Sequence, residues 1–122
     1  MTKKKILIVE DEVFLAETIG ARLEFLGYEV LSVEKGEAAL EILAEGPFDL
    51  ILMDWMLPGI DGLETTRRIR KDPKRGLIPI IFMSARARAQ DAEEARSAGA
   101  TDYVAKPFES EDLVRAIQKW LP

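Results

Sequence analysis

Acidic residues end two of the most apolar segments of this 122-residue chain. Glu10 and Asp11 follow the segment 6–9, and Asp54 follows the segment 48–53. A carboxylate at the mouth of an apolar core is unusual, because desolvation disfavours its charged form. Clustered carboxylates also raise one another's pKa values unless a cation lies between them. Since only oxygen ligands are available, the pattern favours a hard divalent ion such as Mg²⁺, which uses one or two carboxylates plus waters and a phosphate.

A hydroxyl and an amine end two further apolar segments. Ser84 closes the segment 78–84, and Lys106 follows the segment 101–105. In a parallel sheet all these strand ends meet at one edge, where open α/β proteins bind their ligands. A metal ion and Lys106 would there stabilise ionised Asp54; the alternative is that the acids merely cap helices or meet solvent. The polar groups that follow the five segments are Glu10, Asp11, Glu34, Asp54, Ser84 and Lys106.

The composition excludes several classes of chemistry. The chain has no cysteine and no histidine, which rules out disulfides, thiol catalysis, Ser-His-Asp chemistry and the usual zinc sites. Covalent chemistry would have to use a carboxylate, a hydroxyl or a lysine. The net charge of -5 argues against direct nucleic-acid binding. The apolar stretch after the basic MTKKK segment is too short for a signal peptide or a membrane span, so we expect a cytoplasmic protein without membrane contact.

The elements that would position these groups alternate along the chain. Three of the five apolar segments are nearly continuous, as expected for strands covered on both faces, and the second alternates like an edge strand. Helical spacing lies between them, so the pattern predicts an α/β protein: a doubly wound (βα)5 parallel sheet with helices on both faces and right-handed crossovers. The five predicted strands are 6–9, 28–33, 48–53, 78–84 and 101–105.

Capping residues and glycines mark the ends of the predicted helices. Asp61 can cap the third helix, with Glu64 as its capping-box partner. Ser110 is the expected N-cap of the last helix, and Lys119 lies in its last turn, where a cation suits the helix dipole. The other signals are Leu15, Ile19 and Leu23 before Gly27; Ala38, Ala39, Ile42 and Leu43 before Gly46-Pro47; the stretch 89–98 before Gly99; and Leu113, Ile117 and Leu121.

Four motifs together resemble the receiver domain of two-component response regulators. They are ILIVEDE, DLILMDWMLPGIDG, MSA and DYVAKPF, in the family's order and spacing, and they cover essentially the whole chain. Each string alone is weak evidence, whereas all four together are highly specific. The resemblance, to the single-domain form of the chemotaxis regulators, implies a flavodoxin-like sheet with strand order 2-1-3-4-5. It also implies that residues 1–122 form one receiver domain without a linker or an output domain in this chain, and a stand-alone regulator, a receiver cut from a longer protein and an engineered sequence all fit that pattern.

The resemblance assigns the acids to phosphoryl transfer and metal binding. Asp54 matches the aspartate that accepts a phosphoryl group from the phosphohistidine of a sensor histidine kinase or a histidine phosphotransfer protein. Asp11 matches a direct ligand of Mg²⁺, for which Mn²⁺ is an alternative, and Glu10 matches an acid that acts through water. The backbone carbonyl of Met56 matches a further ligand. Met56 and Arg86 are expected to border the phosphoryl pocket and to influence how long the phosphorylated state lasts.

Three further residues match the family's switch. Ser84 corresponds to the hydroxyl that hydrogen-bonds the phosphoryl group, and Lys106 to the lysine that pairs with it. The family has a cis bond at the position of Lys106-Pro107, and the sequence does not fix the isomer. Tyr103 matches the aromatic that turns inward behind Ser84; the alternative is an aromatic packed at the sheet edge. The implied output is a change in the face of the fourth helix, fifth strand and fifth helix, which controls a downstream protein target, in a monomer or a phosphorylation-dependent dimer.

Three alternatives have specific signals against them. A phosphatase with an aspartate nucleophile usually has a second acid two residues later, and here that position is Met56. A flavodoxin-like electron carrier needs a Ser/Thr/Gly-rich loop after the first strand, where this chain has EDEVF. The basic stretch RRIRKDPKRG could suggest nucleic acid, but cations at a helix C-terminus commonly complement the dipole. The resemblance therefore predicts a signalling switch that catalyses only its own phosphorylation and slow autodephosphorylation, not an enzyme.

Overall fold

The sheet has the predicted doubly wound topology. The computed structural model describes residues 2–86 and 88–122. All strand pairs are parallel and the order is β2-β1-β3-β4-β5, which confirms the expected order 2-1-3-4-5. In chain order the elements are β1 (Lys5–Val9), α1 (Val13–Phe25), β2 (Glu29–Val33), α2 (Gly36–Glu45), β3 (Leu50–Asp54), α3 (Gly62–Lys71), β4 (Ile80–Ser84), α4 (Ala89–Ala98), β5 (Asp102–Ala105) and α5 (Ser110–Trp120).

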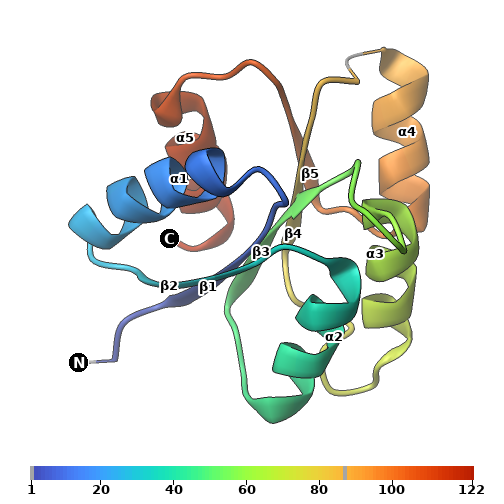
Figure 1. Ribbon diagram of the computed structural model, residues 1–122, viewed down its shortest axis with the longest axis horizontal. Coiled ribbons are helices and arrows are strands. Elements are labelled where there is room, and N and C mark those ends of the chain that lie inside the picture. The colour runs from blue at the N-terminus through green and yellow to red at the C-terminus, as the bar shows by residue number, and fades with distance from the viewer. Residues whose placement is uncertain (1, 87) are drawn as a thin grey trace.

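Helices cover both faces of the sheet, with α1 and α5 on one side and α2, α3 and α4 on the other (Figure 1). Successive side chains of a strand point to opposite faces, so Ile6 and Ile8 pack under α1 and α5 while Leu7 and Val9 pack against the other layer. This double coverage explains why β1, β3 and β4 are nearly continuous apolar runs. The strand β2 lies at the sheet edge, as its sequence predicted, and is half-exposed, but its exposure does not alternate strictly because Leu31 and Ser32 are both exposed.

The helix ends correct two capping predictions. Ser110 is the first residue of α5 and not its N-cap; Glu109 precedes the helix, and its backbone N–H donates to the Asp112 carboxylate at 3.0 Å. Asp61 caps α3 as predicted by accepting the Glu64 N–H at 2.9 Å. The Glu64 carboxylate, however, accepts from an arginine one turn later and does not complete a capping box. At α5 the reciprocal pair Glu109 and Asp112 takes the cap one residue earlier, and at α3 the guanidinium of Arg68 draws the Glu64 carboxylate away.

Within residues 2–86 and 88–122, no helix is both long enough and apolar enough to cross a bilayer.

Candidate functional site

Three carboxylates converge where β1 and β3 end. Asp54 is the last residue of β3, and Glu10 and Asp11 follow β1, whose Val9 lies beside Met53 in the sheet. Glu10 and Asp54 are only 1% and 5% exposed, whereas Asp11 is exposed. One carboxylate oxygen of each lies within 4.8 Å of the others. The structure therefore brings together the acids that the sequence singled out.

Lys106 reaches into this cluster from the end of β5. Its Nζ lies 2.8 Å from a Glu10 oxygen and 3.5 Å from an Asp54 oxygen. Its backbone N–H donates to the Ser84 carbonyl at 2.7 Å, and the bond to Pro107 is cis. Across the residues that the structure describes, Lys106 is the only cation within ion-pair distance of the three acids. Two of the acids, Glu10 and Asp54, thus share one lysine, and Asp11 has no ion pair among the described residues.

This imbalance perturbs the ionisation of the site. Burial, together with the neighbouring Glu10 carboxyl and to a lesser degree Asp11, raises the pKa of Asp54 from 3.8 to about 7, against the opposing pull of Lys106. Burial works against the charged form of Lys106, but its hydrogen bond to Glu10 and the two nearby negative charges outweigh burial and raise its pKa. A phosphate group or a metal ion would therefore meet a charged lysine beside a crowded acid.

The acids open into a cleft of about 480 Å³. Ser84, 1% exposed, ends β4 at its wall, and its Oγ accepts the Arg86 N–H at 3.1 Å. The Met56 side chain is 62% exposed beside it, and the small Ala85 leaves the entrance open. Met56 and Arg86 border the cleft as predicted. Its full lining is Glu10, Asp11, Glu12, Asp54, Met56, Ser84, Ala85, Arg86 and Lys106.

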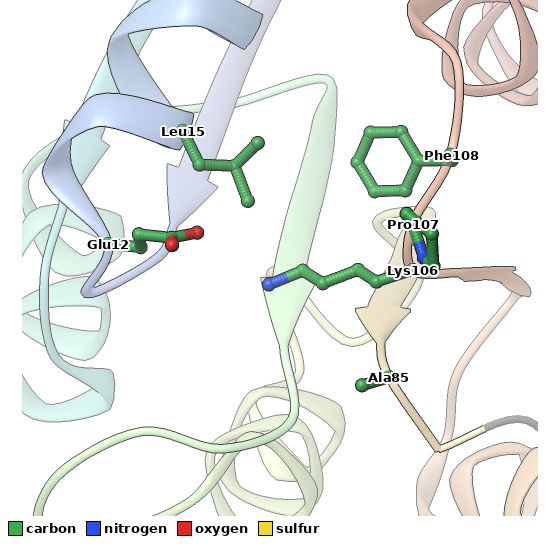
Figure 2. Close-up of a pocket in the computed structure, with 6 residues that line it drawn as sticks. All are labelled: Glu12, Leu15, Ala85, Lys106, Pro107 and Phe108. Carbon is green, nitrogen blue, oxygen red and sulfur yellow. The ribbon is translucent and has the colours of Figure 1, made fainter.

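An apolar cavity of about 330 Å³ adjoins the cleft and shares Lys106 with it. Figure 2 shows Lys106 extended from the end of β5 along this cavity, with Leu15 on α1 and Phe108 on the segment before α5. Phe14, on the first turn of α1, is 79% exposed. The charged cleft therefore has an apolar flank on the side of α1.

Gly62 lets the end of β3 lie against the start of α3. Its N–H donates to the Trp55 carbonyl at 2.8 Å, and a Cβ at this position would collide with the backbone carbonyl of Asp54. Any larger residue would displace the strand end that carries the buried acid. A glycine at the start of this helix is thus a steric requirement of the site.

The donor set fits a hard divalent ion. Carboxylate oxygens are the ligands that Mg²⁺ prefers, and two ligands on opposite sides of one Mg²⁺ lie about 4 Å apart. The mutual distances allow Asp11 and Asp54 to share an ion after a small adjustment. Both oxygens of Glu10 are engaged, one by Lys106 and the other by the Glu12 N–H at 3.2 Å. That engagement suits the predicted action of Glu10 through water.

An aromatic cluster lies behind the cleft. The Tyr103 ring stacks on Phe82 with centroids 6.4 Å apart and meets Trp55 edge-on at 6.4 Å. Its hydroxyl donates to the Arg86 carbonyl. Trp55, next to the predicted phosphoacceptor, is only 2% exposed. The ring therefore packs at the sheet edge and also contacts the loop that carries the cleft residue Arg86; its inward turn behind Ser84 stays a prediction.

Two acids near the sheet edge differ from the sequence-based expectation: Glu34 lies outside the site, and the buried Asp91 was not predicted. Glu34 follows β2 but is exposed and lies outside the cluster of three acids. Asp91, in the first turn of α4, is 2% exposed and binds two arginines of the preceding loop. An acid in the first turn of a helix is common, so its sequence position alone did not distinguish Asp91.

Comparison with known proteins identifies relatives over nearly the whole chain. Residues 6–118 match the family described as "Response regulator receiver domain". The phosphate regulon transcriptional regulatory protein PhoB of Pseudomonas aeruginosa is 40% identical over 118 residues, which are 97% of this chain and 52% of that protein. The uncharacterized transcriptional regulatory protein YkoG of Bacillus subtilis is 43% identical over 97% of this chain and 51% of its own length. The chain thus spans about half the length of the curated relatives it matches.

Solved structures give the same result at the level of the fold. A putative response regulator from Chloroflexus aurantiacus has a TM-score of 0.94 and 35% identity, with 98% of each chain covered. The receiver domain of the sensor histidine kinase PA1611 from Pseudomonas aeruginosa has a TM-score of 0.90 and 39% identity, again with 98% of each chain covered. That structure holds a magnesium ion coordinated in its active site cleft.

Proposed function

The chain belongs to the response regulator receiver domain family, and on this basis we propose that Asp54 accepts a phosphoryl group in a Mg²⁺-dependent reaction. The observation that carries the proposal is the meeting of three carboxylates and one lysine in a cleft open to a donor. A carboxylate is a competent nucleophile for this transfer. The proposed donor is the phosphohistidine of a sensor histidine kinase or of a histidine phosphotransfer protein.

The transfer itself needs few groups. An Asp54 carboxylate oxygen attacks phosphorus, a new O–P bond forms, and the P–N bond to the donor histidine breaks. The leaving imidazole keeps the bonding electron pair and takes up a proton from solvent. Lys106 lies close enough to Asp54 to pair with the arriving phosphoryl oxygens, and the Ser84 hydroxyl can donate to them.

We assign the metal to Asp11, Asp54 and the backbone carbonyl of Met56. Bound Mg²⁺ would supply positive charge against the phosphoryl oxygens and between the carboxylates. Glu10 would hold Lys106 in place through the 2.8 Å ion pair and reach the ion through water. The PA1611 receiver domain, with magnesium in its cleft, supports this assignment by likeness. Mn²⁺ is an alternative occupant with similar ligand preferences.

The proposed output is a change in the face formed by α4, β5 and α5. Tyr103 lies on β5 and contacts the loop after Ser84, so a movement of Ser84 toward a phosphoryl group would be felt by the aromatic ring. Two or three charge-assisted hydrogen bonds of about 1.5–3 kcal/mol each are enough to invert a 1:99 equilibrium, which requires about 5.5 kcal/mol. The downstream partner would be a protein that binds this face.

Intact mass after incubation with Mg²⁺ and acetyl phosphate tests the proposal. The expected product carries one added phosphoryl group that hydroxylamine removes. Asp54→Asn should take up none, and omission of the metal should prevent uptake by the wild type.

Asp61→Asn is the matched control, because it removes an acid from the same connection while an asparagine can still cap α3. It should be phosphorylated like the wild type. Uptake by Asp54→Asn at the wild-type rate would refute the assignment of the phosphoacceptor.

A further inference from the structure

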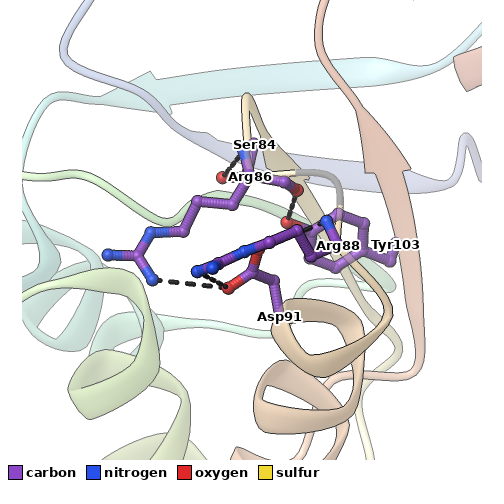
Figure 3. A network of polar contacts seen from close by, with 5 residues as sticks. All are labelled: Ser84, Arg86, Arg88, Asp91 and Tyr103. Atoms are coloured by element: carbon purple, nitrogen blue, oxygen red, sulfur yellow. Dashed lines mark hydrogen bonds and ion pairs between the residues drawn. The ribbon is translucent and has the colours of Figure 1, made fainter.

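Arg86 lies between the cleft and the first turn of α4. Its guanidinium carbon is 4.7 Å from the centre of the Trp55 ring, and its Nη1 is 3.5 Å from an oxygen of Asp91. Figure 3 shows the side chain extended from the loop after Ser84 toward Asp91. The Arg86 side chain is 44% exposed, so this position leaves it room to move. Arg86 also lines the cleft that contains Asp54.

Asp91 does not depend on Arg86 for its charge. Its carboxylate accepts from the Arg88 Nε at 3.2 Å and from the Arg88 backbone N–H at 3.2 Å. These bonds to Arg88, with smaller contributions from the charges of Arg88 and Arg86, lower the pKa of Asp91 despite its burial. Loss of Arg86 would therefore leave the buried acid with its nearer partner. Arg86 is the exchangeable member of the pair.

A phosphoryl group on Asp54 would change the balance of charge in the cleft. The product would be an acyl phosphate; like the phosphate monoesters of other side chains, which carry about −1.5 to −2 at neutral pH, it offers three strong acceptor oxygens. Lys106 is already shared between Glu10 and Asp54. A guanidinium is suited to phosphate, because its planar set of N–H groups can donate two parallel hydrogen bonds. The phosphoryl group would thus be a stronger partner for Arg86 than a carboxylate that Arg88 already serves.

We propose that Arg86 is a second cationic ligand of the phosphoryl group and that it exchanges Asp91 for that group when Asp54 is modified. The inference rests on the proposed function and deepens it. The exchange moves no covalent bond: one ion pair and the contact with Trp55 are given up, and new hydrogen bonds to phosphoryl oxygens form. Because the backbone of Arg86 also binds Ser84 and Tyr103, the movement would reach both switch residues.

The test is calorimetric titration with beryllofluoride, an analogue of the phosphoryl group, in saturating Mg²⁺. Arg86→Ala should weaken binding about threefold to fivefold, which corresponds to about 0.7–1 kcal/mol and is the upper part of the range for a partly exposed ion pair. Asp91→Asn should strengthen binding about twofold to threefold, because it releases Arg86. In the Arg86→Ala background, Asp91→Asn should have no effect.

Arg88→Ala is the matched control, since it removes the same charge from the same carboxylate but does not line the cleft. Arg88→Ala should leave the affinity for beryllofluoride unchanged, or lower it slightly because Arg86 would then be the only arginine paired with Asp91. Equal weakening by Arg86→Ala and Arg88→Ala would overturn the inference and indicate general electrostatics. So would an Asp91→Asn gain that persists without Arg86.

Different results would refute the phosphorylation of Asp54 and the role of Arg86. If the wild type binds beryllofluoride and is phosphorylated on Asp54 while Arg86→Ala binds equally well, only the role of Arg86 is overturned. If the wild type neither binds the analogue nor takes up phosphate, the proposed function fails and the inference falls with it. A change in Trp55 emission on binding, measured in Trp120→Phe and reduced by Arg86→Ala, would be an independent sign of the exchange.

Discussion

Arg70 and Asp54 are charged groups at opposite ends of the same sheet, and their surroundings differ in kind. Arg70, on α3, donates to the carbonyls of Gly99, Gly76 and Ile78 at 2.8, 3.0 and 2.6 Å, and to the Thr101 hydroxyl at 3.1 Å. Its charge is spread over neutral acceptors from the segments that enter β4 and β5. Asp54 instead faces two other acids and one shared lysine.

The comparison separates a charge that holds the fold from one that is available for chemistry. The hydrogen bonds of Arg70 close one end of the molecule around a guanidinium, and burial lowers its pKa without removing its charge. At the other end the raised pKa of Asp54 marks a carboxylate that lacks a sufficient counter-charge. Binding of a cation or covalent modification at Asp54 would therefore be favourable, because it supplies or removes charge. The guanidinium of Arg70 already has its hydrogen-bond acceptors, so no similar stabilisation is available there.

Loss of Arg70 should be the most damaging change. Arg70→Ala would leave several half-buried carbonyls without a donor and detach α3 from the segments before β4 and β5. We expect it to lower the free energy of unfolding by about 3 kcal/mol. Urea denaturation at pH 7.5 measures this. Arg67→Ala, which removes an exposed ion pair of 3.7 Å on the same helix, should cost about 0.5 kcal/mol or less. Equal losses of stability in Arg70→Ala and Arg67→Ala would mean that the hydrogen bonds of Arg70 do not hold this end of the fold.

Loss of the Asp54 charge should raise the free energy of unfolding, in contrast to the loss of Arg70. Because its pKa rises from 3.8 to about 7 on folding, the folded protein binds more protons than the unfolded chain between these pH values, and this group makes stability fall as pH rises through that window. Without divalent metal, Asp54→Asn should therefore be more stable than the wild type by about 2 kcal/mol at pH 8. The advantage should vanish near pH 4, as unfolding curves across this range would show. A destabilised variant at pH 8 would contradict the account.

Magnesium should reduce the repulsion among the three acids at the Asp54 end of the sheet and leave the Arg70 end unaffected. At ten times its dissociation constant, Mg²⁺ should stabilise the wild type by about 1.4 kcal/mol. The gain should be the same in Arg70→Ala and much smaller in Asp11→Asn at the same metal concentration. Thermal unfolding with Mg²⁺ and with EDTA provides the measurement, and an equal gain in Asp11→Asn would place the ion elsewhere.

The smallest expected effect is the coupling between the two ends. Since Arg70 and Asp54 share no partner and lie at opposite ends of the sheet, their changes in unfolding free energy should add to within about 0.5 kcal/mol. A double-mutant cycle with Arg70→Ala and Asp54→Asn in metal-free buffer measures the difference. Coupling of 1 kcal/mol or more would mean that the two regions are not independent.

The sequence was sufficient where one local signal decides the outcome. Continuous apolar runs identified the central strands, and the polar residues after them converged because parallel strands present their ends at one edge. Arg70 was missed because its basic stretch was interpreted only as a complement to the helix dipole. It lies four residues after the fully buried Thr66 and so shares that face of α3, a signal that could have found it. Asp91 could not be found this way, since its partners depend on the path of the β4–α4 loop.

The most direct test of the central claim is the titration of the Asp54 carboxyl carbon by NMR in the presence and absence of Mg²⁺. The account predicts a pKa of about 7 in metal-free protein and a fall of two units or more when the ion binds. A value near 3.8 without metal, or one that Mg²⁺ leaves unchanged, would mean that the three acids do not form the electrostatic unit on which the proposed phosphoryl transfer depends.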